Sequence, residues 1–357
     1  MSLAPGATLG ILGGGQLGRM LAMAAHRLGL RVHVFAQEAG EPAVQVTDRA
    51  TLAAFDDAQA LAAFAASVDV VTLEFENVPV ASVEALAARV PVRPGAGVLA
   101  VAQDRLREKR FAHSLGLETA PFVAYAGPAD APELDRLAFP ARVKTRRLGY
   151  DGKGQRRVLA AAEVAAAWEG MGRVPCVVES ELTFRRELSV LVARRPSGAS
   201  ATFPLAENRH ADGILRETLA PAAVDAATAA AAHDLAVRIA AGLGLEGLLA
   251  VELFETEPGA LVVNELAPRP HNSGHWTLDG CSVDQFEQAV RAVCDWPLAQ
   301  PRALVDTRMR NLLGDDVDAW PSWLAHPHAR LHLYGKAEAR PGRKMGHVTV
   351  LDLDRSG

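Results

Sequence analysis

Hydrophobic and polar positions divide the first hundred residues into short apolar runs and longer helical patterns. Three apolar runs have the length of buried strands, and three Ala/Leu-rich stretches repeat with helical spacing. The predicted strands lie at 9–12, 31–35 and 68–73, and the predicted helices at 17–28, 57–66 and 81–89. This alternation predicts β-α-β units, and therefore a small parallel sheet covered by helices.

The rest of the chain has a different pattern, in which short strands follow one another with few helices between them. An amphipathic helix is predicted over 103–116 and an Ala-rich helix over 222–242. The predicted strands lie around 122–125, 140–144, 155–159, 175–179, 187–193, 202–206, 248–254 and 260–264. Strands joined by short loops indicate an α+β arrangement. The stretch DWPLAQPRA then separates a last segment with short strands and several basic residues.

Composition narrows the class of protein. The 357 residues are 49% hydrophobic and 22% charged, which is typical of a globular protein with a large core. A net charge of -5 gives no electrostatic basis for a nucleic-acid or membrane partner. Three scattered cysteines without C-x-x-C spacing argue against a disulfide framework or a zinc site. The N-terminus lacks the features of a signal peptide, so we expect a cytoplasmic protein.

The stretch ILGGGQLGRM (11–20) matches the dinucleotide-binding fingerprint at Gly13, Gly15 and Gly18. An apolar run precedes it, and Glu38 follows about twenty residues later, where NAD enzymes place a ribose-binding acid. The pattern is compatible with an NAD-dependent dehydrogenase. It is equally compatible with a turn that brings a different ligand close to bare backbone.

A second glycine-rich stretch, KTRRLGYDGKGQ (144–155), lies between two predicted strands. A Walker P-loop would run into a helix, so this stretch suits a flap whose backbone N–H groups close over phosphate oxygens. Lys144 would add a positive charge to those phosphates. The alternative is a hairpin turn with solvated charges.

The stretch VELFETEPGALVVNEL (251–266) predicts a hairpin with a four-residue loop. In that register Phe254 pairs with Val263, and Glu252 lies directly opposite Glu265. Facing like charges destabilise a hairpin unless a divalent cation bridges them, and magnesium bound by carboxylates and substrate phosphates suits this pattern. A solvent-facing hairpin that tolerates the acidic pair is the alternative.

Three further polar clusters suggest binding sites. The stretch APRPHNSGHWT (267–277) follows the acidic strand and contains Arg269, His271, Asn272, Ser273 and His275. The stretch RPGRKMGH (340–347), with Lys336 before it, suggests a site for a small anion. LEFENVP (73–79) ends the third strand with Glu74, Glu76 and Asn77. Because ligands bind at the carboxyl ends of parallel strands, these acids and the first glycine loop are expected to share one crevice.

Taken in order along the chain, seven stretches resemble the ATP-grasp superfamily, and within it the N5-carboxyaminoimidazole ribonucleotide synthetases of purine biosynthesis. They are ILGGGQLGRM, EFENVP, DRLREK, GYDGKGQ, ENRHADGIL, NELAPRPHNSGHWT and RPGRKMGH. The resemblance implies an ATP-grasp fold, α/β and α+β in class, built from three domains. These would be a Rossmann-like pre-ATP-grasp parallel-sheet domain (1–100), an ATP-grasp domain (101–297) with a mobile lid at about 118–180, and a small C-terminal domain (298–357).

The resemblance also implies a reaction and its participants. Bicarbonate would attack the γ-phosphate of ATP to give carboxyphosphate, and the exocyclic amine of 5-aminoimidazole ribonucleotide would capture the carboxyl group or the carbon dioxide released from it. ATP and one or two Mg²⁺ ions would be required, and a homodimer is expected, with no nucleic-acid or membrane partner.

Residue roles implied by the resemblance fall into three groups. ATP would contact Arg105, Lys144, Gly149, Tyr150, Asp151, Gly152, Lys153, Gly154, Gln155, Glu179, Ser180, Glu181, Leu182, Glu187, His210, Asn264 and Glu265. Bicarbonate and the ribonucleotide would contact Gln16, Leu17, Glu74, Asn77, Tyr150, Asp151, Lys153, Arg269, His271, Asn272, Lys336, Arg343 and Lys344. Catalysis would depend on Arg269, Lys144, Glu252 and Glu265, of which Glu252 and Glu265 would hold the metal.

Two positions depart from the family pattern. Leu148 stands where a glycine is usual, so we expect a stiffer lid, and Lys153 replaces a frequent arginine. The rival interpretations are another ATP-grasp ligase, such as formate-dependent glycinamide ribonucleotide transformylase or biotin carboxylase, or a non-catalytic nucleotide-binding protein. An NAD-dependent dehydrogenase would leave everything after residue 140 unexplained.

Overall fold

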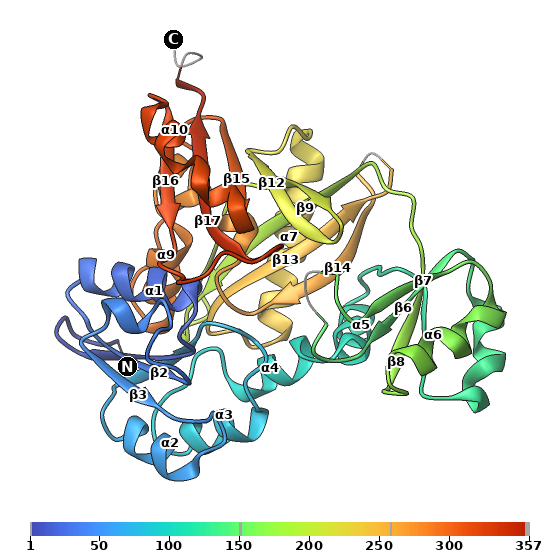
Figure 1. The fold of residues 1–357 in the computed structure, drawn as a ribbon, viewed down its shortest axis with the longest axis horizontal. Helices are drawn as coiled ribbons and strands as arrows, with labels where there is room; N and C mark the ends of the chain where they lie inside the picture. Colours follow the sequence, from blue (N-terminus) through green and yellow to red (C-terminus); the bar gives the residue numbers. More distant parts are fainter. Residues whose placement is uncertain (1, 150–151, 258, 354–357) are drawn as a thin grey trace.

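Three β-sheets organise the chain in the computed structural model, which describes residues 2–149, 152–257 and 259–353 (Figure 1). The first sheet is parallel, as the alternation of strands and helices predicts. The other two sheets contain antiparallel pairs, as the α+β pattern predicts.

The first sheet has four strands in the order β3-β2-β1-β4. Its strands are β1 (Thr8–Leu12), β2 (Arg31–Ala36), β3 (Arg49–Leu52) and β4 (Val70–Leu73). The helices of this part are α1 (Gln16–Arg27), α2 (Ala58–Ala65), α3 (Val80–Ala87) and α4 (Ala96–Ala102). Each predicted strand and helix of the first hundred residues is confirmed. The short β3 is partly exposed and has no apolar run, which is why the hydrophobic pattern does not predict it.

Helix α5 (Arg105–Ser114) follows α4 and precedes the second sheet, whose four strands run in the order β5-β8-β6-β7. These strands are β5 (Phe122–Tyr125), β6 (Ala141–Thr145), β7 (Gln155–Val158) and β8 (Cys176–Ser180). Helix α6 (Val164–Gly170) packs Trp168 into a small core with Val123, Val143 and Val178. The second sheet therefore has a hydrophobic core of its own.

The third sheet has nine strands, eight of them in the order β14-β13-β9-β11-β12-β15-β17-β16, while β10 pairs with β9. Its first strands are β9 (Arg186–Arg194), β10 (Ser200–Thr202), β11 (Ala206–Ala211), β12 (Ile214–Ala220), β13 (Gly247–Glu255) and β14 (Leu261–Ala267). The C-terminal strands are β15 (Thr307–Leu313), β16 (Ala329–Leu333) and β17 (Lys344–Leu351). The predicted strand over 202–206 is wrong, because the chain leaves β10 after Thr202 and enters β11 at Ala206.

Helices cover both faces of this sheet. The remaining helices are α7 (Ala226–Gly242), α8 (Thr277–Gly280), α9 (Gln285–Val293) and α10 (Trp320–Ala325). Alternate residues of β9 face opposite sides: Val190 packs in one core with Ile239 of α7, whereas Leu191 packs in the other with Phe286 of α9. That second core continues into α1, so the first sheet and the third share buried side chains.

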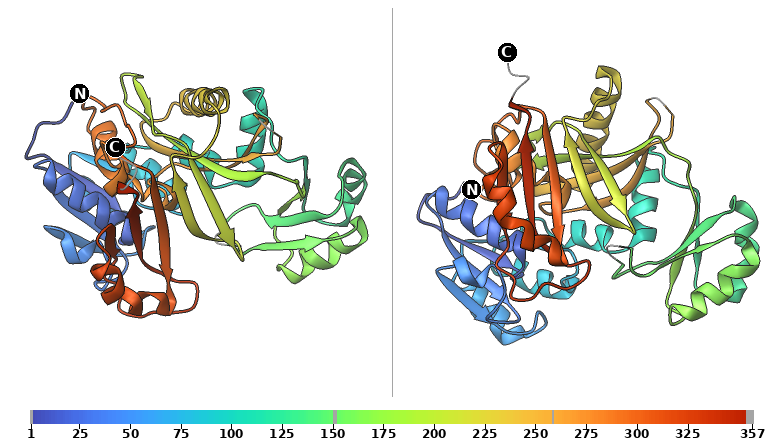
Figure 2. Two further views of the ribbon diagram at one scale, coloured as in Figure 1. Left: turned by 90° about the horizontal axis from the view of Figure 1, so that it is seen from above. Right: turned by 45° about the horizontal axis from the view of Figure 1, so that its top comes forward.

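The first and second sheets lie on different sides of the third, and Figure 2 shows the second sheet projecting from the rest of the molecule in both further views. The C-terminal strands β15 to β17 lie above the first sheet in Figure 1. None of the helices in the described part of the chain has both the length and the apolar character that a membrane span requires.

Candidate active site

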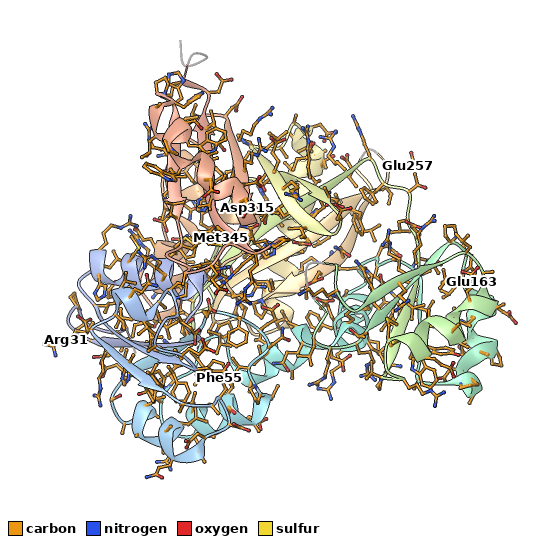
Figure 3. The ribbon with its side chains drawn as sticks, in the orientation of Figure 1. Arg31, Phe55, Glu163, Glu257, Asp315 and Met345 are labelled. Atoms are coloured by element: carbon orange, nitrogen blue, oxygen red, sulfur yellow. The ribbon has the colours of Figure 1, made fainter. Side chains whose placement is uncertain are left out.

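A cleft of about 1480 Å³ lies where the three sheets and the loop before β17 meet. Nine Lys or Arg and six Asp or Glu side chains of the described residues line it, although the whole chain carries a net charge of -5. This local excess of positive charge favours anionic ligands. In the view of Figure 3 the labelled Met345, which follows the cleft residue Lys344, lies between Arg31 at the start of β2 and Glu163 just before α6.

Glu252 on β13 and Glu265 on β14 lie directly opposite each other in this cleft, which confirms the acidic pair predicted from the sequence. Burial, followed by the facing Glu265 carboxylate, raises the pKa of Glu252 to about 7. The Arg105 guanidinium lies 2.9 Å from Glu265, and His271 Nε2 lies 3.3 Å from Glu252. The two carboxylates thus form one repulsive pair with a cationic or imidazole neighbour on each side.

A β-bulge sets this register. The predicted pairing of Phe254 with Val263 is wrong, because Phe254 faces Val262 and Leu253 faces Val263. The register shifts by one residue at Asn264, and this shift brings the two glutamates opposite each other. The bulge also leaves Asn264 in the cleft lining.

The donor set fits magnesium rather than a transition metal. In the described part of the chain, no group of three or more His, Cys, Asp or Glu side chains is arranged to hold a metal ion by itself. Mg²⁺ needs no such group, because it commonly takes one or two carboxylates and completes its shell with water and substrate phosphates. Two facing carboxylates in a cleft that favours anions provide these conditions.

The second glycine-rich stretch joins β6 to β7 as a loop along the cleft. Gly152 and Gly154 have φ angles of 77° and 69°, and a Cβ at Gly154 would lie 2.6 Å from Thr145 Oγ1, so the turn requires glycine. Leu148 also has a left-handed φ of 62° and is 71% exposed. The predicted contacts Tyr150 and Asp151 lie outside the described residues.

Lys144, on β6, reaches the cleft beside this loop. Its Nζ donates to Glu179 Oε2 at 2.8 Å, and burial lowers its pKa. Although burial acts in the opposite direction, Lys144 and Lys109 lower the pKa of Glu179 to about 2. The Glu179 side chain is 5% exposed and does not line the cleft, so the structure places it behind Lys144.

The fingerprint glycines surround a protein carboxylate. The N–H groups of Gly15 and Gly18, at the start of α1, donate to the two oxygens of Glu74 at 3.0 Å each. A dinucleotide fold would direct these donors at a pyrophosphate. Glu38 is exposed and does not line the cleft. This arrangement argues against the dehydrogenase interpretation, because the donors that would bind the phosphate are engaged by Glu74.

Arg269 has a partner, Glu76, which the sequence places in the crevice but to which it assigns no role. Its guanidinium forms a bidentate ion pair with the Glu76 carboxylate, and the distance from Nη2 to Oε1 is 3.0 Å. Although burial raises the pKa of Glu76, Arg269 lowers it overall. The sequence places Glu76 in LEFENVP beside Glu74, but a pair separated by 193 positions gives no local signal.

Other polar side chains in the cleft are also held by partners. His210 is hydrogen-bonded to Glu187, which raises its pKa despite burial. Asn272 Nδ2 donates to Asn311 at 2.9 Å. The Lys336 ammonium donates to the Lys344 carbonyl at 2.7 Å, which closes the basic loop before β17.

Most of the predicted side chains come together. Those that line the cleft are Gln16, Leu17, Glu74, Asn77, Arg105, Lys144, Gly152, Lys153, Gly154, Gln155, Glu187, His210, Glu252, Asn264, Glu265, Arg269, His271, Asn272, Lys336, Arg343 and Lys344. Five predicted residues lie outside the lining: Gly149, Glu179, Ser180, Glu181 and Leu182. The lining also includes Arg142, Phe184, Asp212 and Phe254, which were not predicted. Arg142 shares a face of β6 with Lys144, so strand alternation could have identified it.

Comparison with known families accounts for nearly the whole chain. Residues 6–103 match the ribonucleotide synthetase preATP-grasp domain, residues 110–286 the ATP-grasp domain, and residues 307–356 the phosphoribosylaminoimidazole carboxylase C-terminal domain.

Individual proteins are similar over the same length. A protein of Brucella melitensis named N5-carboxyaminoimidazole ribonucleotide synthase is 47% identical over 98% of this chain and 97% of its own. The crystal structure of the Staphylococcus aureus N5-carboxyaminoimidazole synthetase with ADP has a TM-score of 0.94 at 36% identity, covering 99% of this chain and 95% of that one. The Aspergillus clavatus synthase, in complex with ADP and 5-aminoimidazole ribonucleotide, has a TM-score of 0.91 at 31% identity, covering 97% and 94%.

Proposed function

The chain belongs to the N5-carboxyaminoimidazole ribonucleotide synthase family of ATP-grasp ligases, and we propose how the residues of its cleft divide the work of that family's reaction. The reaction joins bicarbonate to 5-aminoimidazole ribonucleotide at the expense of ATP and releases ADP and phosphate, in purine biosynthesis. The protein is therefore an ATP-dependent carbon–nitrogen ligase. The main support for this proposal is that two acidic residues, a glycine loop and two separate groups of basic residues all line one cleft.

ATP would bind between the second and third sheets. The loop at 152–155 and Lys144 would contact the phosphates, and Arg105 would lie between them and Glu265. Two stacked rings, Phe184 and Phe254, whose centroids are 4.6 Å apart, add an apolar wall to this side of the cleft. Phosphoryl transfer needs positioning and charge neutralisation more than covalent chemistry, and this arrangement supplies both.

Glu252 and Glu265, with Asn264 beside them, would hold Mg²⁺ together with the phosphates of ATP. A bound magnesium ion would neutralise negative charge on the phosphates and relieve the repulsion between the two carboxylates. The fit of the facing pair to this ion supports the proposal.

Bicarbonate would bind at Arg269, whose orientation Glu76 fixes through two contacts. An oxygen of bicarbonate would attack the γ-phosphorus of ATP. The bond between the γ-phosphorus and ADP would break, and carboxyphosphate would form. The amine of the ribonucleotide would then take the carboxyl group, or the carbon dioxide released from it, and phosphate would leave. His271 and Asn272, which follow Arg269 and line the same wall, would contact the ribonucleotide.

The phosphate of the ribonucleotide would bind the basic loop before β17. Lys336, Arg343 and Lys344 line the cleft there. Charge-assisted hydrogen bonds to a phosphate are strong and directional, which suits a substrate whose reactive amine must face Arg269.

Release of phosphate from ATP, measured with each substrate omitted in turn, tests the activity. We expect turnover to require bicarbonate and 5-aminoimidazole ribonucleotide together. Stimulation by formate and glycinamide ribonucleotide instead would favour a different ATP-grasp ligase. We expect no saturable fluorescence enhancement with NADH, because Glu74 fills the phosphate position of the fingerprint.

We also propose a homodimer and a cytoplasmic location. The three cysteines are buried free thiols, which supports a reducing compartment. Sedimentation equilibrium of the purified protein tests the homodimer, and a single species with the mass of one chain would contradict it.

A further inference from the structure

Three buried charged side chains, Lys144, Glu179 and Lys109, form a row that begins at the cleft wall. The proposed reaction gives a role only to Lys144. Lys144 Nζ lies 2.8 Å from Glu179 Oε2, and Lys109 Nζ of helix α5 lies 3.3 Å from Glu179 Oε1. The side chains of Lys144, Glu179 and Lys109 are 14%, 5% and 2% exposed. Lys144 lines the cleft, whereas the other two do not, so the row runs from the cleft into the protein.

The charges of this row do not balance. Two ammonium groups share one carboxylate, and no other carboxylate among the described residues forms a salt bridge with either lysine. The Arg105 guanidinium is paired with Glu265 at 2.9 Å. Glu108, beside Lys109 on α5, accepts the Leu266 N–H at 2.6 Å. Within the row itself the two ammonium groups outnumber the carboxylate by one, and Lys144 is the member of the row that lines the cleft.

We propose that Lys109 is a positioning residue that keeps Lys144 available to the nucleotide phosphates by engaging the other oxygen of Glu179. Without Lys109, Glu179 would neutralise Lys144 completely and draw its ammonium group away from the ligand. Buried charges interact strongly because the effective dielectric constant around them is low. Lys109 therefore changes the affinity of the protein for the nucleotide, although it does not contact the nucleotide. The inference rests on the proposed contact between Lys144 and phosphate.

The structure favours a variant that folds. Lys109→Met keeps a linear side chain of similar length beside the Phe122 ring, whose centroid is 5.8 Å from Nζ. It also leaves Glu179 paired with Lys144, so no buried charge is left without a partner. Glu179→Gln alone would leave two buried ammonium groups facing each other. The double variant Lys109→Met/Glu179→Gln restores a single positive charge at Lys144.

Calorimetric titration of the full chain with ADP and with adenosine, in buffer without divalent cations, tests the inference. We expect Lys109→Met to weaken ADP binding by about tenfold and to leave adenosine binding unchanged, because only ADP carries phosphate charge. The double variant should recover most of the lost ADP affinity. A general packing defect would weaken both ligands, and the second substitution would not restore ADP binding.

Lys144→Met separates this inference from the proposed function on which it rests. If Lys144→Met loses ADP affinity while Lys109→Met binds ADP as the native chain does, Lys109 has no such role and the phosphate contact stands. The same conclusion about Lys109 follows if the double variant binds ADP no better than Lys109→Met. If neither single variant weakens ADP, the proposed contact of Lys144 fails, and the inference fails with it.

Discussion

At the scale of single residues, the side chains of the cleft are positioned by partners from other parts of the chain, and Arg269 is the clearest case. We expect Glu76→Gln to reduce turnover at least about tenfold, because the buried guanidinium loses its counter-charge and its fixed orientation. The free energy of unfolding should fall by about 2 kcal/mol for the same reason. Phosphate-release kinetics and urea unfolding measure the two effects. Glu38→Gln, at an exposed acid outside the cleft, is the control and should change neither.

Glu265 allows a second prediction on the acidic hairpin. Glu265→Gln should lower kcat by at least about a hundredfold, because it removes a carboxylate proposed to hold magnesium and leaves Arg105 without its 2.9 Å partner. Far-UV circular dichroism should remain native. Glu257→Gln, at the exposed end of the same hairpin (Figure 3), should keep full activity. Native turnover in Glu265→Gln would rule out the metal role.

At the scale of elements, local periodicity predicts a strand well and its pairing less well. The sequence predicts that Glu252 faces Glu265, yet the pairs nearer the turn are displaced by one residue, because the bulge at Asn264 has no signature in the hydrophobic pattern. The strand expected over 202–206 fails because Pro204 lies within it, and proline cannot donate to a ladder. Turn length and bulges depend on tertiary packing, which cannot be predicted from the sequence of one hairpin alone.

The candidate site shows the same limit. Glu74, Arg269 and Lys344 are predicted from short polar clusters, because each cluster is dense in one kind of chemistry. The strand ends predict that Glu74 lies near the first glycine loop, but they do not predict the individual contacts, whose backbone N–H donors precede Glu74 by more than 50 residues. Contacts of this kind follow from how the elements pack, which periodicity does not determine.

The glycine turn that begins α1 gives a prediction at this scale. A Cβ at Gly15 would lie 2.4 Å from Glu74 Oε1, so Gly15→Ala should displace that carboxylate and raise KM for the ribonucleotide. Crowding of this kind costs about 1–3 kcal/mol of stability. Gly97→Ala, inside helix α4 where a Cβ meets nothing within 4 Å, should instead stabilise the protein by up to about 1 kcal/mol. Thermal unfolding of both variants tests these opposite shifts, and a lower melting temperature for both would contradict them.

At the scale of the whole molecule, the cleft is completed by parts of the chain that pack in different ways. The first and third sheets share a core through α1 and α9, whereas the second sheet packs its own. A part with its own core can change position without exposing a core that it shares with its neighbours. Such independence suits the proposed lid, which must open for ATP and close to shield carboxyphosphate from water.

A row of three imidazoles links the C-terminal strands to the cleft, in which His347 and the cleft residue His275 are buried and His332 is partly exposed. His347 of β17 is fully buried, stacks on His332 with ring centroids 4.5 Å apart, and lies 4.7 Å from the His275 ring. Tyr334 Oη lies 2.8 Å from its Nδ1. Burial, and then the neighbouring imidazoles, lowers the pKa of His347 and of His275 well below the ordinary value of about 6.5. The folded protein therefore holds both rings neutral.

The sign of the resulting pH dependence follows from proton uptake. Below about pH 6.5 the unfolded chain binds protons at these histidines and the folded chain does not, so the free energy of unfolding falls as the pH is lowered. Each histidine contributes up to about 1.4 kcal/mol per pH unit, and this stability is fully present above about pH 7. Urea unfolding between pH 5.5 and 7.5 should show a shallower slope in His347→Gln than in the native chain. His326→Gln, at an exposed histidine of the same region, should keep the native slope. An unchanged slope in His347→Gln would mean that this ring takes up protons equally in the folded and the unfolded protein, and that His347 does not make the stability sensitive to acid.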